Sequence, residues 1–184
     1  MSTVSNVTAA KPVVAGAVAV AATTAMLPTA ASTTLGTQFT SLGYISEDVL
    51  TNNNTPESET IKAWGGDIVL TPVSGKEDTF TFTLIEAINM DVLKVVYGSS
   101  NVTGSLGSGI TVNAKVSEME AHAWVIDMIL RNNVAKRIVI PNGTISEVGE
   151  ITYADAEAVG YEITVTAFPN SSGITHYEYI KSGS

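Results

Sequence analysis

The sequence contains no cysteine, which excludes disulfides, thiolate nucleophiles and every zinc or iron-sulfur site that needs sulfur ligands. Histidine is also scarce, and the two residues, His122 and His176, lie too far apart in sequence to show any metal-ligand spacing. We expect both to be packed or surface side chains. The fold must be held by packing alone, and we expect no metal and no cofactor.

Positive charge is scarce as well. Nine Lys and Arg stand against 18 Asp and Glu, which gives a net charge of -9 at pH 7. This balance argues against a phosphate-binding surface and against stable DNA binding. Charged residues make up only 15% of the chain, while Thr, Ser, Val and Ala recur throughout. That composition is too apolar for disorder and favours a mainly β fold, and 184 residues fit one domain.

Motifs for nucleophilic or nucleotide chemistry are missing. The sequence has no Gly-x-Ser-x-Gly, no phosphate-cradling Gly-Lys-Ser/Thr and no dinucleotide-binding Gly-x-Gly-x-x-Gly. One acidic group without intervening Lys or Arg could form a calcium site but more simply forms a charged surface; it comprises Glu147, Glu150, Asp155, Glu157 and Glu162. An enzyme is therefore the least favoured class.

Long apolar runs are also absent. The longest candidate, residues 13–22, could pass for the apolar region of a secretory signal, but no positive charge precedes Lys11 and Pro12 opens the run. Val14, Val18 and Val20 are separated by small residues in a way that favours a strand. The run is shorter than the roughly 20 residues of a spanning helix, so we expect no membrane anchor.

Turn-forming residues divide the chain into an expected flexible arm (1–10), a single domain (11–181) and a frayed tail (182–184). Within the domain, residues 47–59 contain Asn52-Asn53-Asn54-Thr55-Pro56 between acidic residues and read as a long exposed loop. Long loops of this kind often carry contacts with other molecules.

Strand patterns fill most of the remainder. We expect strands at residues 39–46, 60–64, 67–71, 79–83, 109–115, 134–140, 144–151, 161–167 and 174–180, with turns at Gly65-Gly66, Asn132-Asn133, Pro141-Asn142-Gly143 and residues 169–173. A short helix is predicted over residues 89–97, capped by Asn89 and ended by Gly98. Residues 117–130 fit either a helix, with Ser117 and Glu120 as a capping box, or a strand.

Several stretches in a fixed order resemble the signature of siphophage tail tube (major tail) proteins. They are Leu42 to Asp48, Ile61 to Asp67, the helix over 89–97, Arg137 to Asn142, Val148 to Tyr153 and Thr164 to Ala167. The resemblance covers residues 12 to 180 and departs from the pattern at Val49, where a glycine is expected. It also implies that residues 121–131 form a strand rather than a helix.

This resemblance implies a β-sandwich or barrel with one flanking helix, and a structural rather than enzymatic function. Subunits are expected to form hexameric rings that stack into the hollow tail tube of a long non-contractile tail, around a tape-measure protein, with DNA only in transit. Assembly in the host cytoplasm and localisation in the virion follow. The candidate subunit or ring-stacking contacts are Tyr44, Glu47, Asp48, Asn52, Asn53, Asn54, Glu57, Lys62 and Trp64.

Two alternatives remain open. The inner tube of a contractile tail, or of a type VI-like injection machine, shares the architecture implied by the resemblance. A secreted β-sandwich module, with the 13–22 run as a cleaved signal and Gly/Asn-rich loops as the ligand-binding surface, belongs to a different class.

Overall fold

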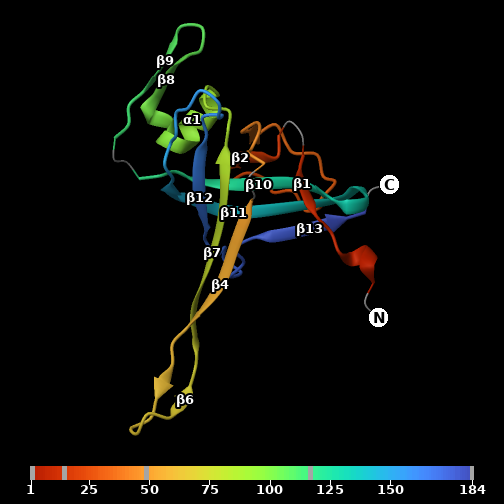
Figure 1. Ribbon diagram of the computed structural model, residues 1–184, viewed down its shortest axis with the longest axis vertical. Helices are drawn as coiled ribbons and strands as arrows, with labels where there is room; N and C mark the ends of the chain where they lie inside the picture. Colours follow the sequence, from red (N-terminus) through yellow and green to blue (C-terminus); the bar gives the residue numbers. More distant parts are fainter. Residues whose placement is uncertain (1–2, 14–15, 48–49, 116–117, 183–184) are drawn as a thin grey trace.

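Strands make up most of the regular structure, which confirms the mainly β expectation. A computed structural model, shown in Figure 1, describes residues 3–13, 16–47, 50–115 and 118–182. The strands are β1 (Ala10–Pro12), β2 (Val18–Ala22), β3 (Thr40–Ser41), β4 (Thr51–Ser58), β5 (Ile61–Lys62), β6 (Ile68–Leu70), β7 (Val73–Leu84), β8 (Val102–Ser105), β9 (Gly109–Val112), β10 (Ala121–Leu130), β11 (Val134–Val148), β12 (Tyr161–Ala167) and β13 (Tyr177–Lys181). The one α-helix in these residues is α1 (Met90–Tyr97).

One large antiparallel sheet organises the body. Its strand order is β3-β2-β10-β11-β12-β7-β4, with β1 added alongside β10 and β13 alongside β11. In Figure 1, strands β10, β11 and β13 run across the view while β7 and β12 run roughly along the long axis, so the sheet bends sharply at its middle. No helix in the described part of the chain is long and apolar enough to cross a membrane.

The bend is located in β11, the longest strand, with 15 residues. Its first half pairs with β10 and β13, and its second half pairs with β12. Between the pairs Trp124↔Ile140 and His122↔Gly143 the register shifts, so that Pro141 and Asn142 lie opposite Ala123 alone. This is a β-bulge, a position where proline, which lacks a backbone N–H, is tolerated inside a sheet. The prediction that Pro141-Asn142-Gly143 separates two strands is therefore wrong.

Gly143 and Trp124 close the inside of this bend. The indole Nε1 of Trp124 donates a hydrogen bond of 2.9 Å to the carbonyl oxygen of Gly143. A Cβ at Gly143 would lie 2.9 Å from Val165 Cγ1 and 3.0 Å from Trp124 Cδ1, which is too close for a normal contact. Glycine is thus required here by close approach, and the fully buried Trp124 gains a partner for its polar atom.

The main core lies on one face of the bent sheet. Its largest fully buried members are Trp124, Phe80, Phe82, Leu42, Leu84, Ile126, Ile140 and Ile163. Helix α1 covers part of this core with Val92, Leu93, Val95 and Val96. The alternation predicted for residues 79–83 is confirmed, because Phe80 and Phe82 point inward from β7.

The helix has the predicted bounds. The Asn89 side chain accepts a hydrogen bond of 3.0 Å from the backbone N–H of Asp91, as expected of an N-cap. Gly98 ends the helix with φ of 90° and ψ of 138°, so the expected positive φ is present but the backbone is extended rather than left-handed helical. Burial between helix and sheet, where Tyr97 meets Tyr161 edge to face, raises the pKa of Tyr161 to about 12.

The ambiguity over residues 117–130 is resolved in favour of a strand. Residues 121–130 form β10, the partner of both β2 and β11 at the centre of the sheet. Ser117, the proposed first residue of a capping box, lies outside the described residues. The following turn uses Asn132 and Asn133 with φ of 61° and 58°, which fits the expected hairpin, although the connection spans the three residues Arg131–Asn133.

The second face of the sheet is covered by the connection between β2 and β3. Arg137 on β11 lies directly opposite Asp127 on β10 and donates to both carboxylate oxygens, from Nε at 2.6 Å and from Nη2 at 2.7 Å. Its Nη1 donates to the carbonyl oxygens of Ala30 and Thr33 in the connection. The two side chains are 7% and 19% exposed, so this bidentate pair fixes the connection from beneath the surface.

Replacing Arg137 by Met tests the importance of this pair. The substitution leaves the Asp127 carboxylate buried without its partner, and we expect a loss of about 3 kcal/mol in the free energy of unfolding, measured by urea denaturation. The double variant Arg137→Met with Asp127→Leu should regain much of that loss, since both charges are gone.

The matched control is Lys136→Met, which breaks a more exposed ion pair with Glu178 at 2.7 Å. We expect it to cost less than about 1 kcal/mol. Equal losses for Arg137→Met and Lys136→Met would contradict the structural role of the buried pair.

Candidate functional site

The described residues lack the arrangement that a metal-binding site requires. No group of three or more His, Asp or Glu side chains in them is arranged to hold a metal ion. Three members of the predicted acidic group, Glu150, Glu157 and Glu162, line one open polar hollow of about 430 Å³. That hollow is a negatively charged surface feature.

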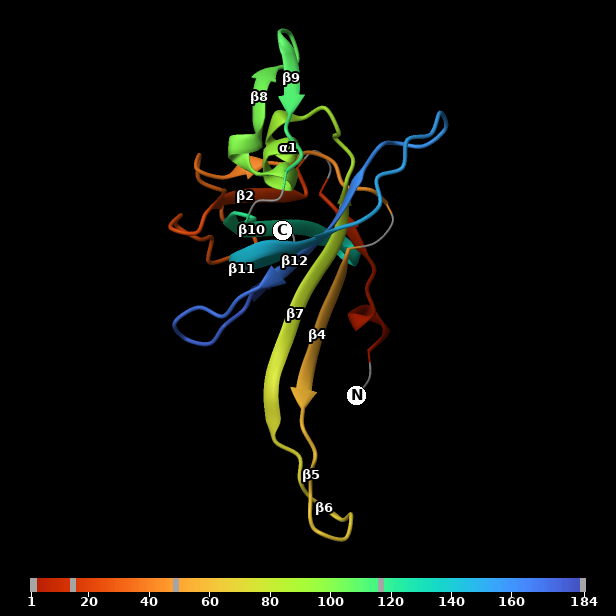
Figure 2. The same ribbon diagram turned by 90° about the vertical axis from the view of Figure 1, so that its left-hand side faces the viewer.

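The most distinctive feature of the molecule is a long, narrow arm that projects from the body (Figure 2). Its stem is the hairpin of β4 and β7, paired in register from Thr51↔Thr81 to Glu57↔Gly75. Residues 47–59 were expected to form a loop, and that prediction is wrong for Thr51–Ser58, which is strand β4. Asn and Pro disfavour strands, but β4 lies at the edge of the sheet, where backbone pairing to β7 is enough and Pro56 is tolerated.

Beyond the stem, β5 and β6 continue the arm to its tip. The strands expected around 60–64 and 67–71 are present in shorter form, joined by a turn in which Gly65 and Gly66 have φ of 125° and 99°. The backbone N–H of Ala63 donates to Asp67 O at 2.8 Å and closes this turn. Only glycine adopts both of these φ values without strain.

The tip exposes apolar side chains. Trp64 is 107% exposed, and four aliphatic residues share the tip with it: Ile61 at 47%, Ile68 at 65%, Val69 at 60% and Leu70 at 57%. We refer to these five residues as the apolar tip. An exposed apolar cluster on an otherwise polar extension typically marks a protein–protein contact. The tip lies far from the body in both views of the ribbon, so the body of the same chain does not cover it.

A buried polar cluster fixes the stem to the body. Asp78 on β7 is 1% exposed and accepts hydrogen bonds from Asn52 Nδ2 on β4, at 2.8 Å, and from Thr175 Oγ1, at 2.5 Å. The same carboxylate lies 2.6 Å from Nδ1 of His176. His176 in turn meets the ring of Phe80 edge to face. Three segments are therefore joined where the arm leaves the core.

Hydrogen bonding dominates the electrostatics of this cluster. Burial acts to raise the pKa of the Asp78 carboxyl, but hydrogen bonds from Thr175, Asn52 and His176, together with the charge of His176, hold that pKa below its usual value. The carboxylate is thus kept ionised inside the protein.

Sequence reasoning missed this cluster. His176 was expected to be an ordinary strand residue, but β13 begins at Tyr177, and nothing in the sequence connects His176 with a residue 98 positions away. The useful signal was the period of two: Asp78 belongs to the same inward-facing series as Phe80 and Phe82. A carboxylate at a core position needs partners.

Six of the predicted contact residues lie on the arm. Asn52, Asn53, Asn54 and Glu57 are exposed on β4, where the Asn52 amide also reaches the buried Asp78, and Lys62 and Trp64 belong to the tip region. Asn53 accepts a hydrogen bond from the Thr55 hydroxyl.

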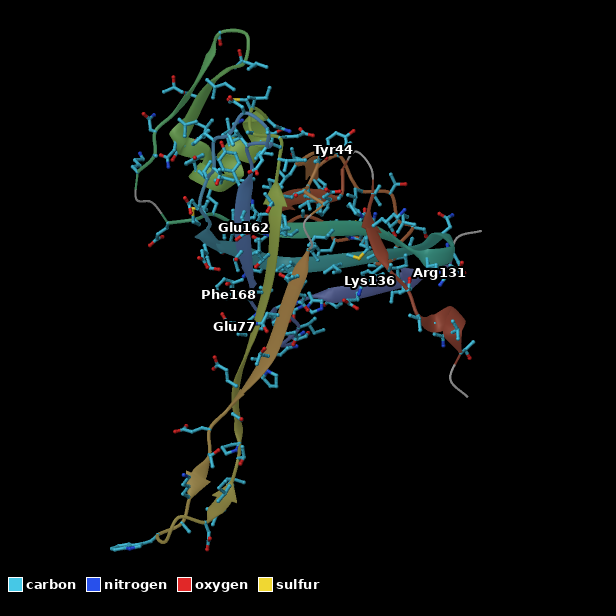
Figure 3. All side chains as sticks on the ribbon, viewed as in Figure 1. Tyr44, Glu77, Arg131, Lys136, Glu162 and Phe168 are labelled. Carbon is cyan, nitrogen blue, oxygen red and sulfur yellow. The ribbon has the colours of Figure 1, made fainter. Side chains whose placement is uncertain are left out.

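The other predicted contact residues lie nearer the body. Glu47 lies at the root of the arm. Tyr44 lies in the body (Figure 3), where its backbone N–H donates to Glu86 at 3.0 Å. Asp48 and Val49 lie outside the described residues.

The expected N-terminal arm runs along the end of β10. Strand β1 begins at Ala10, which pairs with Leu130 of β10. The backbone N–H of Arg131 donates to Thr8 Oγ1 at 2.9 Å. Of the expected tail, Gly183 and Ser184 lie outside the described residues.

Comparison with known proteins agrees with this architecture. A family model described as phage tail tube protein matches residues 6–183, nearly the whole chain. No curated protein matches the sequence.

The Asp78 cluster predicts a specific acid sensitivity. Because the folded-state pKa lies below the unfolded value of 3.8, the cluster contributes stability at all pH values above 3.8 and loses that contribution as pH falls through the folded pKa. Unfolding by urea at a series of pH values from 7 to 2 should show that Asp78→Asn has lower stability than wild type at pH 7, with the difference shrinking below pH 3.8.

The control is Glu77→Gln, which removes an exposed carboxylate from the adjacent position of the same strand. This variant should follow the wild-type pH profile. Parallel profiles for wild type and Asp78→Asn would rule out the stabilising role of the buried carboxylate.

Proposed function

The chain belongs to the phage tail tube protein family, structural and non-enzymatic components of the virion tail, and on that premise we propose that it polymerises as stacked hexameric rings. The rings form the hollow tube of a long non-contractile tail, which encloses a tape-measure protein, joins other tail components and conducts DNA during ejection.

The observation that carries this proposal is the arm with its apolar tip. An isolated subunit leaves Trp64 and the four aliphatic side chains in water, at the end of a projection that its own body does not cover. Burial of such residues contributes about 25 cal/mol per Å² of apolar surface. In a self-assembling protein, a second subunit is present at high local concentration and can cover the apolar tip. The arm is long enough for its tip to reach a subunit of the next ring.

The open sheet supports contacts within a ring. Strand β4 ends the main sheet on one side and β3 ends it on the other, so both present backbone groups that are not used by a neighbouring strand of the same sheet. Such edges invite pairing with another chain. In a ring, each subunit supplies one edge to each neighbour, and the sheets join into a continuous wall.

The charge balance suits a conduit. A net charge of -9 at pH 7 means that assembled subunits repel nucleic acid on average. DNA therefore binds weakly to such a wall, as is required if the DNA passes through the tube without being retained.

Electron microscopy of the purified protein tests the proposal. Negative-stain images at several concentrations, with light scattering on the same samples, should show hollow tubes or six-membered rings whose fraction rises with concentration. A protein that remains monomeric at every concentration, including in the presence of preformed tail tips as initiators, would contradict it.

A shortened arm provides the sharper prediction. Since Thr55 pairs with Glu77, residues 56–76 can be replaced by an Asn-Gly turn that closes the stem without touching the core. We expect this variant to fold, with cooperative unfolding in urea, and to form no tubes because ring-to-ring contacts are lost. Glu77→Gln in the full-length arm is the control and should assemble normally. Tubes of ordinary length from the shortened protein would exclude the arm from stacking.

A further inference from the structure

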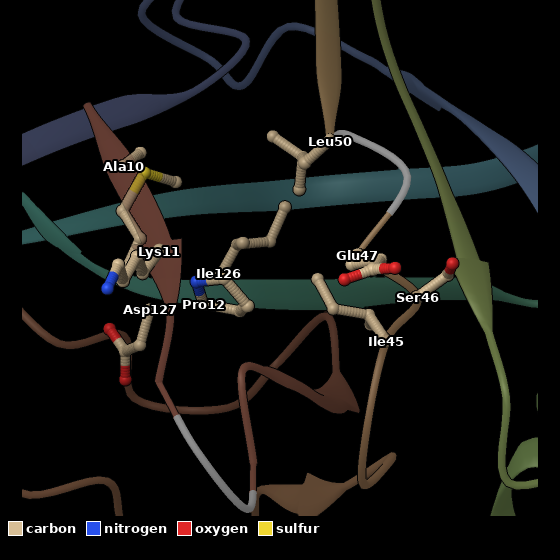
Figure 4. Close-up of a pocket in the computed structure, with 10 residues that line it drawn as sticks. Ala10, Lys11, Pro12, Ile45, Ser46, Glu47, Leu50, Ile126 and Asp127 are labelled. Carbon is tan, nitrogen blue, oxygen red and sulfur yellow. The ribbon is translucent and has the colours of Figure 1, made fainter.

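An apolar groove of about 240 Å³ lies at the root of the arm, and nothing in the described chain occupies it (Figure 4). Ile126 of β10 forms its floor, Pro12 and Met128 lie on the side of β1, and Ile45 and Leu50 lie on the side of the arm. Figure 4 shows Ile45, Leu50 and Ile126 converging on the hollow from separate segments. The groove is therefore built from residues that are more than 30 positions apart in sequence, and it depends on the fold.

The rim of the groove offers a negative charge to a ligand. The Glu47 carboxylate lies on the side of the arm root. Lys11 lines the groove from β1, but it pairs with Ile129, so its side chain lies on the face of the sheet that carries Asp127, away from Ile126 and Met128. The Asp127 carboxylate is held by Arg137. The charge that faces a ligand is thus the Glu47 carboxylate, at the edge of an apolar floor.

The apolar tip has the complementary character. Trp64 is the most exposed large hydrophobic side chain described, and Lys62 at the end of β5 lies two positions before it. A tryptophan entering the groove places an aromatic anchor in a pocket, the arrangement typical of interface hot spots. In that position the Lys62 ammonium can pair with the Glu47 carboxylate at the rim of the groove.

The geometry and charge of these two sites point to one contact: we propose that the groove receives Trp64 from the arm of a second copy of this chain. The inference rests on the proposed function and deepens it, because it identifies the receiving surface for the arm. Among the described residues, the arm tip combines an exposed tryptophan with a neighbouring positive charge, Lys62, that matches the apolar floor and the Glu47 carboxylate.

The positions of groove and tip determine what this contact builds. Leu50 lies at the root of the arm and Trp64 at its end, so an extended strand of that length separates them by roughly 45 Å at about 3.3 Å per residue. A second copy that is shifted along the arm by that distance has its groove at the tip of the first copy's arm. Such a head-to-tail contact uses different surfaces on the two copies and repeats without closing, which is the property of a stack.

The absence of cysteine allows a clean crosslinking test. We expect the double variant Ala63→Cys/Ala10→Cys, which keeps Trp64 and the apolar lining and is oxidised under assembly conditions, to give a ladder of disulfide-linked oligomers on non-reducing gels. A mixture of the two single variants should give dimers, and either single variant alone should give monomers. The control pair is Leu106→Cys/Ala10→Cys, since Leu106 is also exposed, at 66%, on the turn between β8 and β9 and should not crosslink to the groove.

A charge exchange tests the same contact without disulfides. Lys62→Glu sets like charges together and should raise the concentration needed for assembly about tenfold, measured by light scattering. Adding Glu47→Lys to the same chain should restore assembly to near the wild-type concentration. Unchanged urea unfolding of both variants, whose substituted residues are not in the core, separates the effect from folding.

The outcomes distinguish this inference from the proposed function. Tubes with a ladder and charge rescue support both. Tubes without a ladder, or a ladder equally strong for the Leu106 pair, overturn the groove contact and leave the tube function standing. A crosslinked species that stops at the dimer shows a reciprocal pair and also overturns the stacking contact. Failure of the wild-type chain to form rings or tubes overturns the proposed function itself.

Discussion

Strand β7 belongs to the body and to the arm at the same time, and the position of the arm depends on this continuity. At its body end, Phe80, Phe82 and Leu84 are buried in the core, and β12 pairs with it on one side. At its outer end the same strand pairs only with β4 and leaves the body. A strand cannot bend freely while its backbone hydrogen bonds are made, so core packing sets the direction of the arm. The Asp78 cluster lies at the changeover and ties both arm strands to the segment before β13.

Local chemistry made much of the fold predictable. The helix over 89–97, its Asn89 cap, β12 and the left-handed Asn132 and Asn133 all follow from signals within a few residues. The failures are non-local. Pairing with β7 makes residues 51–58 a strand despite their Asn and Pro, and a bulge opposite Ala123 lets β11 continue through Pro141. The contact between Asp78 and His176 depends on the folded topology, which no single-sequence pattern reveals.

The candidate site divides in the same way. The general preference of tryptophan for the core favours burial of Trp64, and only its place beside Gly65 and Gly66 indicates a contact surface; the structure exposes it completely, so the core interpretation is wrong. Tyr44 belongs to the same sequence signature but lies in the body, away from the tip of the arm. The groove at the arm root was not foreseen, because Pro12, Ile45 and Ile126 meet only through the pairing of β1 and β10 and the return of the chain beside β7. The distribution of residue types is nevertheless simple: apolar residues form the core of the body, polar residues cover the stem of the arm, and a small apolar cluster lies at its tip.

A reconstruction of the assembled tube by cryo-electron microscopy, at a resolution that shows side chains, tests the central claim most directly. The account predicts that each arm crosses to the adjacent ring and that Trp64 is buried there, with the axial repeat set by the length of the arm. Arms that lie free in solvent in the assembled tube, or that fold back along their own subunit with Trp64 exposed, would contradict it.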